Sequence, residues 1–77
     1  MRAKNLLRNL GDELRERRKE EGLSQEALAD QAGVHTNVIG RIERGVYNPS
    51  ILVLHAISTR LGVSLSELFA SAERHDK

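Results

Sequence analysis

Apolar residues recur every three or four positions through the first part of the chain, which is the spacing of one face of an α-helix. The leucines that follow this spacing stand among charged neighbours: Leu6, Leu7, Leu10 and Leu14. Gly22 interrupts the pattern, because glycine favours the end of a helix over its interior. The spacing therefore predicts an amphipathic helix over residues 6–21.

Two shorter helices are expected next, joined by a very short turn. Residues 24–32 open on a serine suited to the N-cap position and end at Gly33. Residues 35–44 continue the helical spacing and end at another glycine. Because only Gly33 and Val34 lie between them, the two helices must cross steeply, which is the geometry of a helix-turn-helix unit over residues 24–44.

Two further helices complete the pattern. An Asn-Pro pair after the third helix prevents that helix from continuing. An apolar stripe then runs over residues 51–61 and stops at Gly62. Ser64 and Glu67 have the spacing of a capping box, which predicts a fifth helix over residues 64–72. No alternating strand pattern occurs, so the predicted fold class is all-α.

The length and composition of the chain narrow its chemistry. We expect a single domain over residues 1–77, with its helical core over 6–72. The chain has no cysteine, which removes disulfides and thiolate zinc sites. Its three histidines lack the spacing of metal ligands, so we expect no metal and no cofactor. The net charge is +1, so any electrostatic argument for a nucleic-acid partner must be local.

Several other classes of protein are disfavoured. No apolar run approaches the ~20 residues that a membrane span needs, and the N-terminus lacks the features of a signal peptide. We therefore expect a cytoplasmic protein without membrane contact. The sequence has no nucleophile–base pair, phosphate-binding loop or carboxylate constellation, and its short helices predict no pocket. Neither an enzyme nor a small-molecule site is expected.

The segment HTNVIGRIERG, residues 35–45, divides its residue types between two faces of a helix. At about 100° per residue, Val38, Ile39 and Ile42 share one arc. The opposite arc, called here the polar face, holds Thr36, Asn37, Gly40, Arg41 and Arg44. Asparagine pairs with adenine and arginine with guanine in the major groove, and a bare glycine would let the backbone approach a duplex closely. Any surface helix has a polar face, but the turn before this one favours DNA binding.

The stretch GLSQEALADQAGVHTNVIGRIERGVYNPSILVLHAISTRLGVSLSELF, residues 22–69, resembles the helix-turn-helix domain of the xenobiotic-response-element family, which includes the Cro and phage-repressor domains. The positions in register are Leu23, Ser24, Gln25, Leu28, Ala29, Ala32, Gly33, Val34, Ile39, Ile42, Glu43 and Gly45. The resemblance implies a five-helix lambda-repressor-like fold and a sequence-specific regulator of transcription that binds double-stranded DNA at the nucleoid. Gly40 is similar to a glycine in small controller proteins of restriction–modification systems.

The resemblance also implies roles for individual side chains. The residues that match the family's base-reading positions in the major groove are Thr36, Asn37 and Arg41. Contact with the DNA backbone falls to Ser24, Gln25, Arg44, Tyr47, Asn48 and Ser50. Arg18 and Glu43 match a family pair that forms a partly buried salt bridge. Two points stay open: Tyr47 could instead cover the edge of the core, and either His35 or Thr36 could cap the recognition helix.

One recognition helix reads only a few base pairs, so two copies are needed to discriminate an operator from competing sites. The apolar residues near the end of the chain exceed what a short helix needs for its own packing, and they predict the surface of a two-fold homodimer: Val63, Leu65, Leu68 and Phe69. Such a dimer would bind a near-palindromic site with half-site centres ~34 Å apart.

Repression or autoregulation by occlusion is the default for a chain of this size without an evident activation surface. The alternative is a protein-interaction module, such as an antitoxin, with DNA binding as a secondary activity. That alternative needs an exposed apolar patch or a tail that folds on a partner, and the final stretch ASAERHDK is short and polar.

Overall fold

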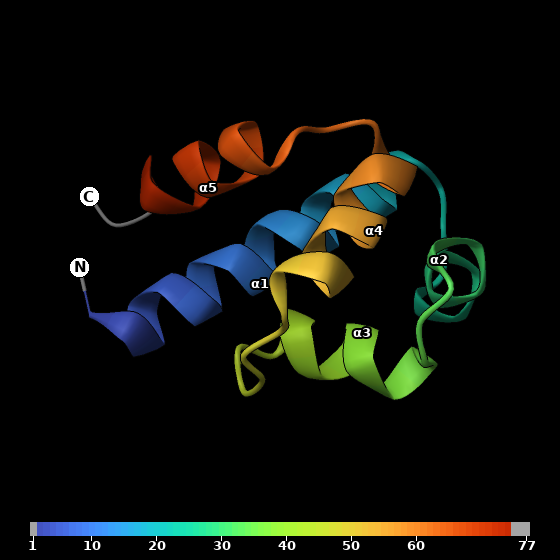
Figure 1. Cartoon of the computed structure of the whole chain (residues 1–77), viewed down its shortest axis with the longest axis horizontal. Coiled ribbons are helices and arrows are strands. Elements are labelled where there is room, and N and C mark those ends of the chain that lie inside the picture. Colours follow the sequence, from blue (N-terminus) through green and yellow to red (C-terminus); the bar gives the residue numbers. More distant parts are fainter. Residues whose placement is uncertain (1, 75–77) are drawn as a thin grey trace.

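The computed structural model describes residues 2–74, which form five α-helices and no strand (Figure 1). The helices are α1 (Ala3–Glu20), α2 (Gln25–Ala32), α3 (Thr36–Glu43), α4 (Ile51–Leu61) and α5 (Leu65–Arg74). The all-α class and the order of the five helices are confirmed.

Both outer helices extend further than the sequence pattern predicts. α1 begins at Ala3 rather than residue 6, because the Arg2 carbonyl accepts hydrogen bonds from the N–H groups of Asn5 and Leu6, both at 3.0 Å. α5 continues to Arg74 rather than ending at residue 72. Its last turn is held by a 2.8 Å hydrogen bond from Arg74 Nη2 to Ser71 Oγ. Polar residues at the ends of the chain thus continue helices that packing has already nucleated.

Serine side chains begin three of the helices, as their sequence positions predict. The Oγ atoms of Ser24, Ser50 and Ser64 accept hydrogen bonds from the N–H groups of Ala27, Val53 and Glu67 at 2.9, 3.1 and 3.1 Å. The reciprocal half of the predicted capping box is different. The carboxylate of Glu67 lies 3.6 Å from Arg17 Nη2 on α1, so it ties α5 to α1 instead of capping its own helix.

Apolar side chains from all five helices form one core. Its buried members are Leu10, Leu14, Leu28, Ala29, Ile39, Ile42, Leu54, Ile57, Leu61, Val63, Leu68 and Ala72. α1 packs against both α3 and α5, and Figure 1 shows it running between them. α2 and α4 pack against each other beside this layer. The longest helix is therefore the support for α3 and α5, while α2 is held by α3 and α4.

The last two helices correct one of our predictions. Val63 and Leu68 are 6% and 0% exposed, so they fill the core of their own chain and are unavailable to a second subunit. Leu65 and Phe69 are half-buried and also pack against the core.

Within residues 2–74 no single helix is long and apolar enough to cross a membrane; α4 and α5 together meet that test only by length and composition, with a 94° bend between them.

Gly11 marks the closest approach of α1 to α3. A Cβ atom at this position would overlap the carbonyl oxygen of Ile42 and lie 2.9 Å from that of Glu43. The Ile42 carbonyl, in the last turn of α3, already accepts a hydrogen bond from the Gly45 N–H at 3.0 Å. The absent side chain therefore sets how closely the end of α3 can seat on α1.

Candidate nucleic-acid interface

α2 and α3 are joined by three residues, of which Gly33 makes the turn possible. Its φ of 73° is a left-handed conformation that glycine adopts without strain. The N–H of Val34 then donates to the Ala29 carbonyl at 2.9 Å, which closes the end of α2. In Figure 1 α2 is seen nearly end-on and α3 lengthwise, so the two helices cross steeply. This is the predicted helix-turn-helix arrangement.

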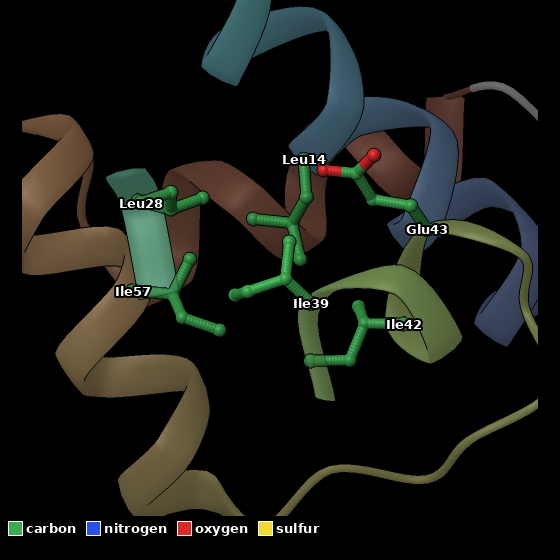
Figure 2. Close-up of a pocket in the computed structure, with 6 residues that line it drawn as sticks. All are labelled: Leu14, Leu28, Ile39, Ile42, Glu43 and Ile57. Carbon is green, nitrogen blue, oxygen red and sulfur yellow. The ribbon is translucent and has the colours of Figure 1, made fainter. Parts of the chain in front are cut away.

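The inner face of α3 is clamped by the core. Ile39 and Ile42 are each 2% exposed. Figure 2 shows them beside Leu14, Leu28 and Ile57, and the space among these side chains is too small for a water molecule. The packing fixes the rotation of α3 about its own axis, and that rotation decides which residues face outward.

The opposite side of α3 carries the polar residues. Thr36, Asn37, Arg41 and Arg44 are all exposed. The one acidic residue of α3, Glu43, is buried and paired with Arg18, so the exposed charges of this helix and its C-cap residue are two arginines. A chain with a net charge of only +1 thus presents a locally positive face, as binding to a phosphate backbone requires.

The position that caps α3 is His35. Its backbone is extended, with φ −72° and ψ 144°, and its side chain makes no capping hydrogen bond. Thr36 is the first helical residue and its side chain is exposed. The open question is therefore answered in favour of His35, and the Thr36 side chain is not needed to cap the helix.

A buried network joins the first three helices behind the polar face. Arg18 Nε and Nη2 donate to the two carboxylate oxygens of Glu43 at 2.7 and 3.0 Å, and Arg18 Nη1 donates to the Leu23 carbonyl at 2.8 Å. The hydrogen bond to Glu43 raises the pKa of Arg18 above its ordinary value, against the effect of burial. Gln25 Nε2 adds a third bond to the same carboxylate, at 3.0 Å from Oε1.

The bond from Gln25 to Glu43 was not predicted. The two residues lie 18 positions apart on different helices, and no local spacing indicates that they meet. Its consequence is that Gln25, at the first turn of α2, is held in place by the end of α3.

We predicted that Gly40 would leave its backbone open to a DNA duplex, but the structure shows this position covered. It is buried although it has no side chain, because two neighbouring side chains cover it. A Cβ atom at Gly40 would lie 3.3 Å from Nη1 of Arg44 and 3.6 Å from Oε1 of Gln25. The structure thus brings Gln25 and Arg44 together across this glycine.

The other residues assigned to the DNA backbone lie at the start of α2 and in the loop between α3 and α4. Ser24, Asn48 and Ser50 are exposed, and two of them cap helices through their side chains. Tyr47 is half-buried and packs against the core, so it covers the core edge and keeps part of its surface exposed.

Residues 14–68 match the family described as helix-turn-helix. The chain belongs to this family. An uncharacterised HTH-type transcriptional regulator of Methanothermobacter thermautotrophicus is 47% identical over 49 residues, which cover 64% of this chain and 71% of that protein. Control protein C.MunI of a Mycoplasma species is 42% identical over 65 residues, which cover 83% and 88% of the two chains.

Among solved structures, the restriction-modification controller protein C.AhdI from Aeromonas hydrophila superposes on this helix-turn-helix protein with a TM-score of 0.78 and 39% identity, over 80% of this chain and 94% of that one. The predicted kinship with Cro-like regulators and with controller proteins is confirmed. Helix-turn-helix regulators bind double-stranded DNA, and this member of the family is a DNA-binding transcriptional regulator rather than an enzyme.

Proposed function

We propose that α3 enters the major groove of an operator and reads base edges through Thr36, Asn37 and Arg41. The observation that carries this proposal is the division of α3 into a clamped apolar side and an exposed polar side. Asparagine and arginine each offer two hydrogen-bonding groups that match adenine and guanine edges. Thr36 and Asn37 lie in the first turn of the helix, the part that enters the groove most deeply in this docking geometry.

The DNA backbone is bound on both sides of α3 in this proposal. The start of α2 supplies Ser24 and Gln25. The C-cap of α3 and the loop that leads into α4 supply the other four residues: Arg44, Tyr47, Asn48 and Ser50. Main-chain N–H groups in the first turn of a helix attract phosphate. Such contacts position the protein without reading sequence, which leaves discrimination to α3.

Two copies bind one operator in this proposal, and we place their contact on another surface because Val63 and Leu68 of the predicted one are buried. Among residues 2–74, the large apolar side chains that remain exposed are Val46, Ile51 and Leu52, at 68%, 62% and 80%. They lie in the loop after α3 and the first turn of α4, next to the residues assigned to phosphate. A second copy seated there would stand beside the first along the duplex.

The outer side of α4 suits a contact between identical chains. Its exposed positions are Ile51, Leu52, His55 and Thr59. Arg60, the one Lys, Arg, Asp or Glu residue of α4, bonds to Gln31 and lies 3.8 Å from Glu21, so it is engaged within its own chain. In a two-fold contact the same face meets itself and residues near the axis lie against their own copies, so a face without Lys, Arg, Asp or Glu side chains avoids repulsion. The molecule measures 32 × 21 × 20 Å between Cα atoms. Copies in contact can therefore match half-sites ~34 Å apart.

The likeness to controller proteins over most of both chains supports a small regulator of the same kind, acting as a repressor or autoregulator by occluding a promoter.

Selection of binding sites from random duplex DNA tests the function directly. We expect a near-palindrome whose half-site centres lie one helical turn, ~34 Å, apart. Arg41→Ala should relax the preference at one base position and weaken binding by about 1–3 kcal/mol. Arg15→Ala, which removes an exposed arginine of α1, serves as the matched control. A wild-type protein that enriches no motif would contradict the proposal.

A further inference from the structure

Gly40 has no side chain, and the side chain of Arg44 fills the space that is left on the polar face of α3. Gly40 and Arg44 are four residues apart, so they lie one above the other on the same side of the helix. Side chains of a helix lean toward its N-terminus, which directs the Arg44 guanidinium back over Gly40. The 3.3 Å separation between Arg44 Nη1 and a Cβ at position 40 shows that even alanine would press on it.

Gln25 lies against the same position. Its Oε1 atom is 3.6 Å from the place of the missing Cβ, and its Nε2 atom donates to Glu43 at 3.0 Å. Glu43 is in turn held by two bonds from Arg18. The amide of Gln25 is thus oriented by a buried network, and one of its two N–H hydrogens remains beyond the bond to Glu43.

We propose that Gly40 is a positioning residue: its missing side chain lets Arg44 lie beside Gln25, so that the two side chains bind the same DNA phosphate. The inference rests on the proposed function and adds to it a specific role for a residue without a side chain. A guanidinium and an amide N–H both donate to phosphate oxygens, and the planar fork of arginine suits two of these oxygens at once. Without the glycine, Arg44 would be displaced from Gln25.

Glycine inside a helix lowers helix stability relative to alanine. At Gly40 the atoms that a Cβ would meet are the ends of flexible side chains, so alanine can be accommodated in the free protein. The inference therefore predicts opposite effects of Gly40→Ala: a higher unfolding temperature and weaker DNA binding. A glycine with a merely structural role would not produce this combination.

The test measures the affinity of the full chain for its selected duplex and for random duplex over a range of salt concentrations. Arg44→Ala should weaken binding to both duplexes about tenfold and lower the slope of log affinity against log salt by about one, the signature of one lost phosphate contact. Gly40→Gln, whose side chain fills the position, should give a similar loss, and Gly40→Ala a smaller one.

The double variant decides the mechanism. If Gly40 acts through Arg44, adding Gly40→Gln to the Arg44→Ala variant will cause almost no further loss of affinity. In an Arg41→Ala background, which leaves Arg44 in place, the loss caused by Gly40→Gln should persist in full. Thermal unfolding of each variant separates misfolding from lost contact, and Gly40→Ala supplies the same comparison with the least perturbation.

An equal loss from Gly40→Gln with and without Arg44 would overturn the inference, because the added side chain would then be blocking the DNA itself. A loss confined to the selected duplex would also overturn it, because base reading and not phosphate binding would be affected. A wild-type protein that binds no duplex would instead refute the proposed function, and this inference with it.

Discussion

Glu43 links the fold to Gln25, one of the residues that we propose bind the DNA backbone. Its carboxylate accepts two bonds from Arg18 and one from Gln25, and its side chain is 4% exposed. A buried carboxylate is tolerable only with such partners, since removing it would leave the Arg18 charge without compensation. The raised pKa of Arg18 means that the pair keeps its contribution from neutral to moderately alkaline pH and loses it only when pH rises through that higher value.

Glu43→Ala should therefore lower the free energy of unfolding by about 3 kcal/mol, measured by denaturant titration. DNA affinity of the remaining folded protein should also fall on all sequences alike, because Gln25 loses the group that orients it. Glu16→Ala, at an exposed position of α1, is the control and should change little. Unchanged stability of the Glu43 variant would show that the network is dispensable.

Two glycines inside helices should respond oppositely to the same substitution. Gly11→Ala places a Cβ against the carbonyl oxygens that end α3, and such overpacking costs about 1–3 kcal/mol. Gly40→Ala meets only flexible side chains and should gain part of the ~1 kcal/mol by which alanine exceeds glycine in a helix. Thermal unfolding of the two variants gives the signs, and a stabilised Gly11 variant would contradict the close approach of α1 and α3.

At the scale of elements, α2 and α3 have eight residues each, below the ~12–15 that an isolated helix needs in water. The cap of α2 and the apolar spacing of both helices could be predicted from the sequence because they depend on neighbours within one turn, whereas the cap of α3 stayed open. The contacts between α2 and α3 could not be predicted. The bond from Gln25 to Glu43 and the covering of Gly40 arise only when α2 and α3 cross, so local spacing carries no sign of them.

The burial of Val63 and Leu68, which we had assigned to the dimer surface, has a similar cause. The apolar stripe of α5 showed correctly that one side of this helix is covered, but a stripe does not say by what. Because α1 extends along α5, its own chain covers Leu68, and Val63 completes the same core. The apolar residues left exposed, such as Leu52, belong to the first turn of α4, where the sequence pattern suggested only ordinary helix packing.

α3 should be open to stabilisation at its N-cap position. His35 holds the N-cap position without a side-chain bond, whereas the serines that begin α2 and α4 each accept one. His35→Ser should supply the missing acceptor and raise the unfolding free energy by about 1 kcal/mol. His55→Ser, in the exposed middle of α4, should give no gain. No increase for the first variant would mean that another group already satisfies this end of α3.

The whole molecule is small, so a modest surface decides its assembly. We expect the two-fold contact through Leu52 and its neighbours to be weak in solution, because a contact between short segments of two small chains belongs to the low end of interface sizes. Sedimentation should show Leu52→Glu as a monomer at concentrations where the wild type dimerises. Lys19→Glu, at an exposed position of α1, should leave the dimer intact. A persistent dimer in the Leu52 variant would place the contact elsewhere.

The close contact between α3 and α1 at Gly11 also predicts which mutations would abolish regulation by this protein. A genetic screen for lost control of a reporter should return changes at Gly11, which lies behind α3 and is buried. Such alleles would mimic binding-site mutations in phenotype, yet lower growth temperature should rescue them, whereas a lost arginine at position 41 would stay defective at every temperature.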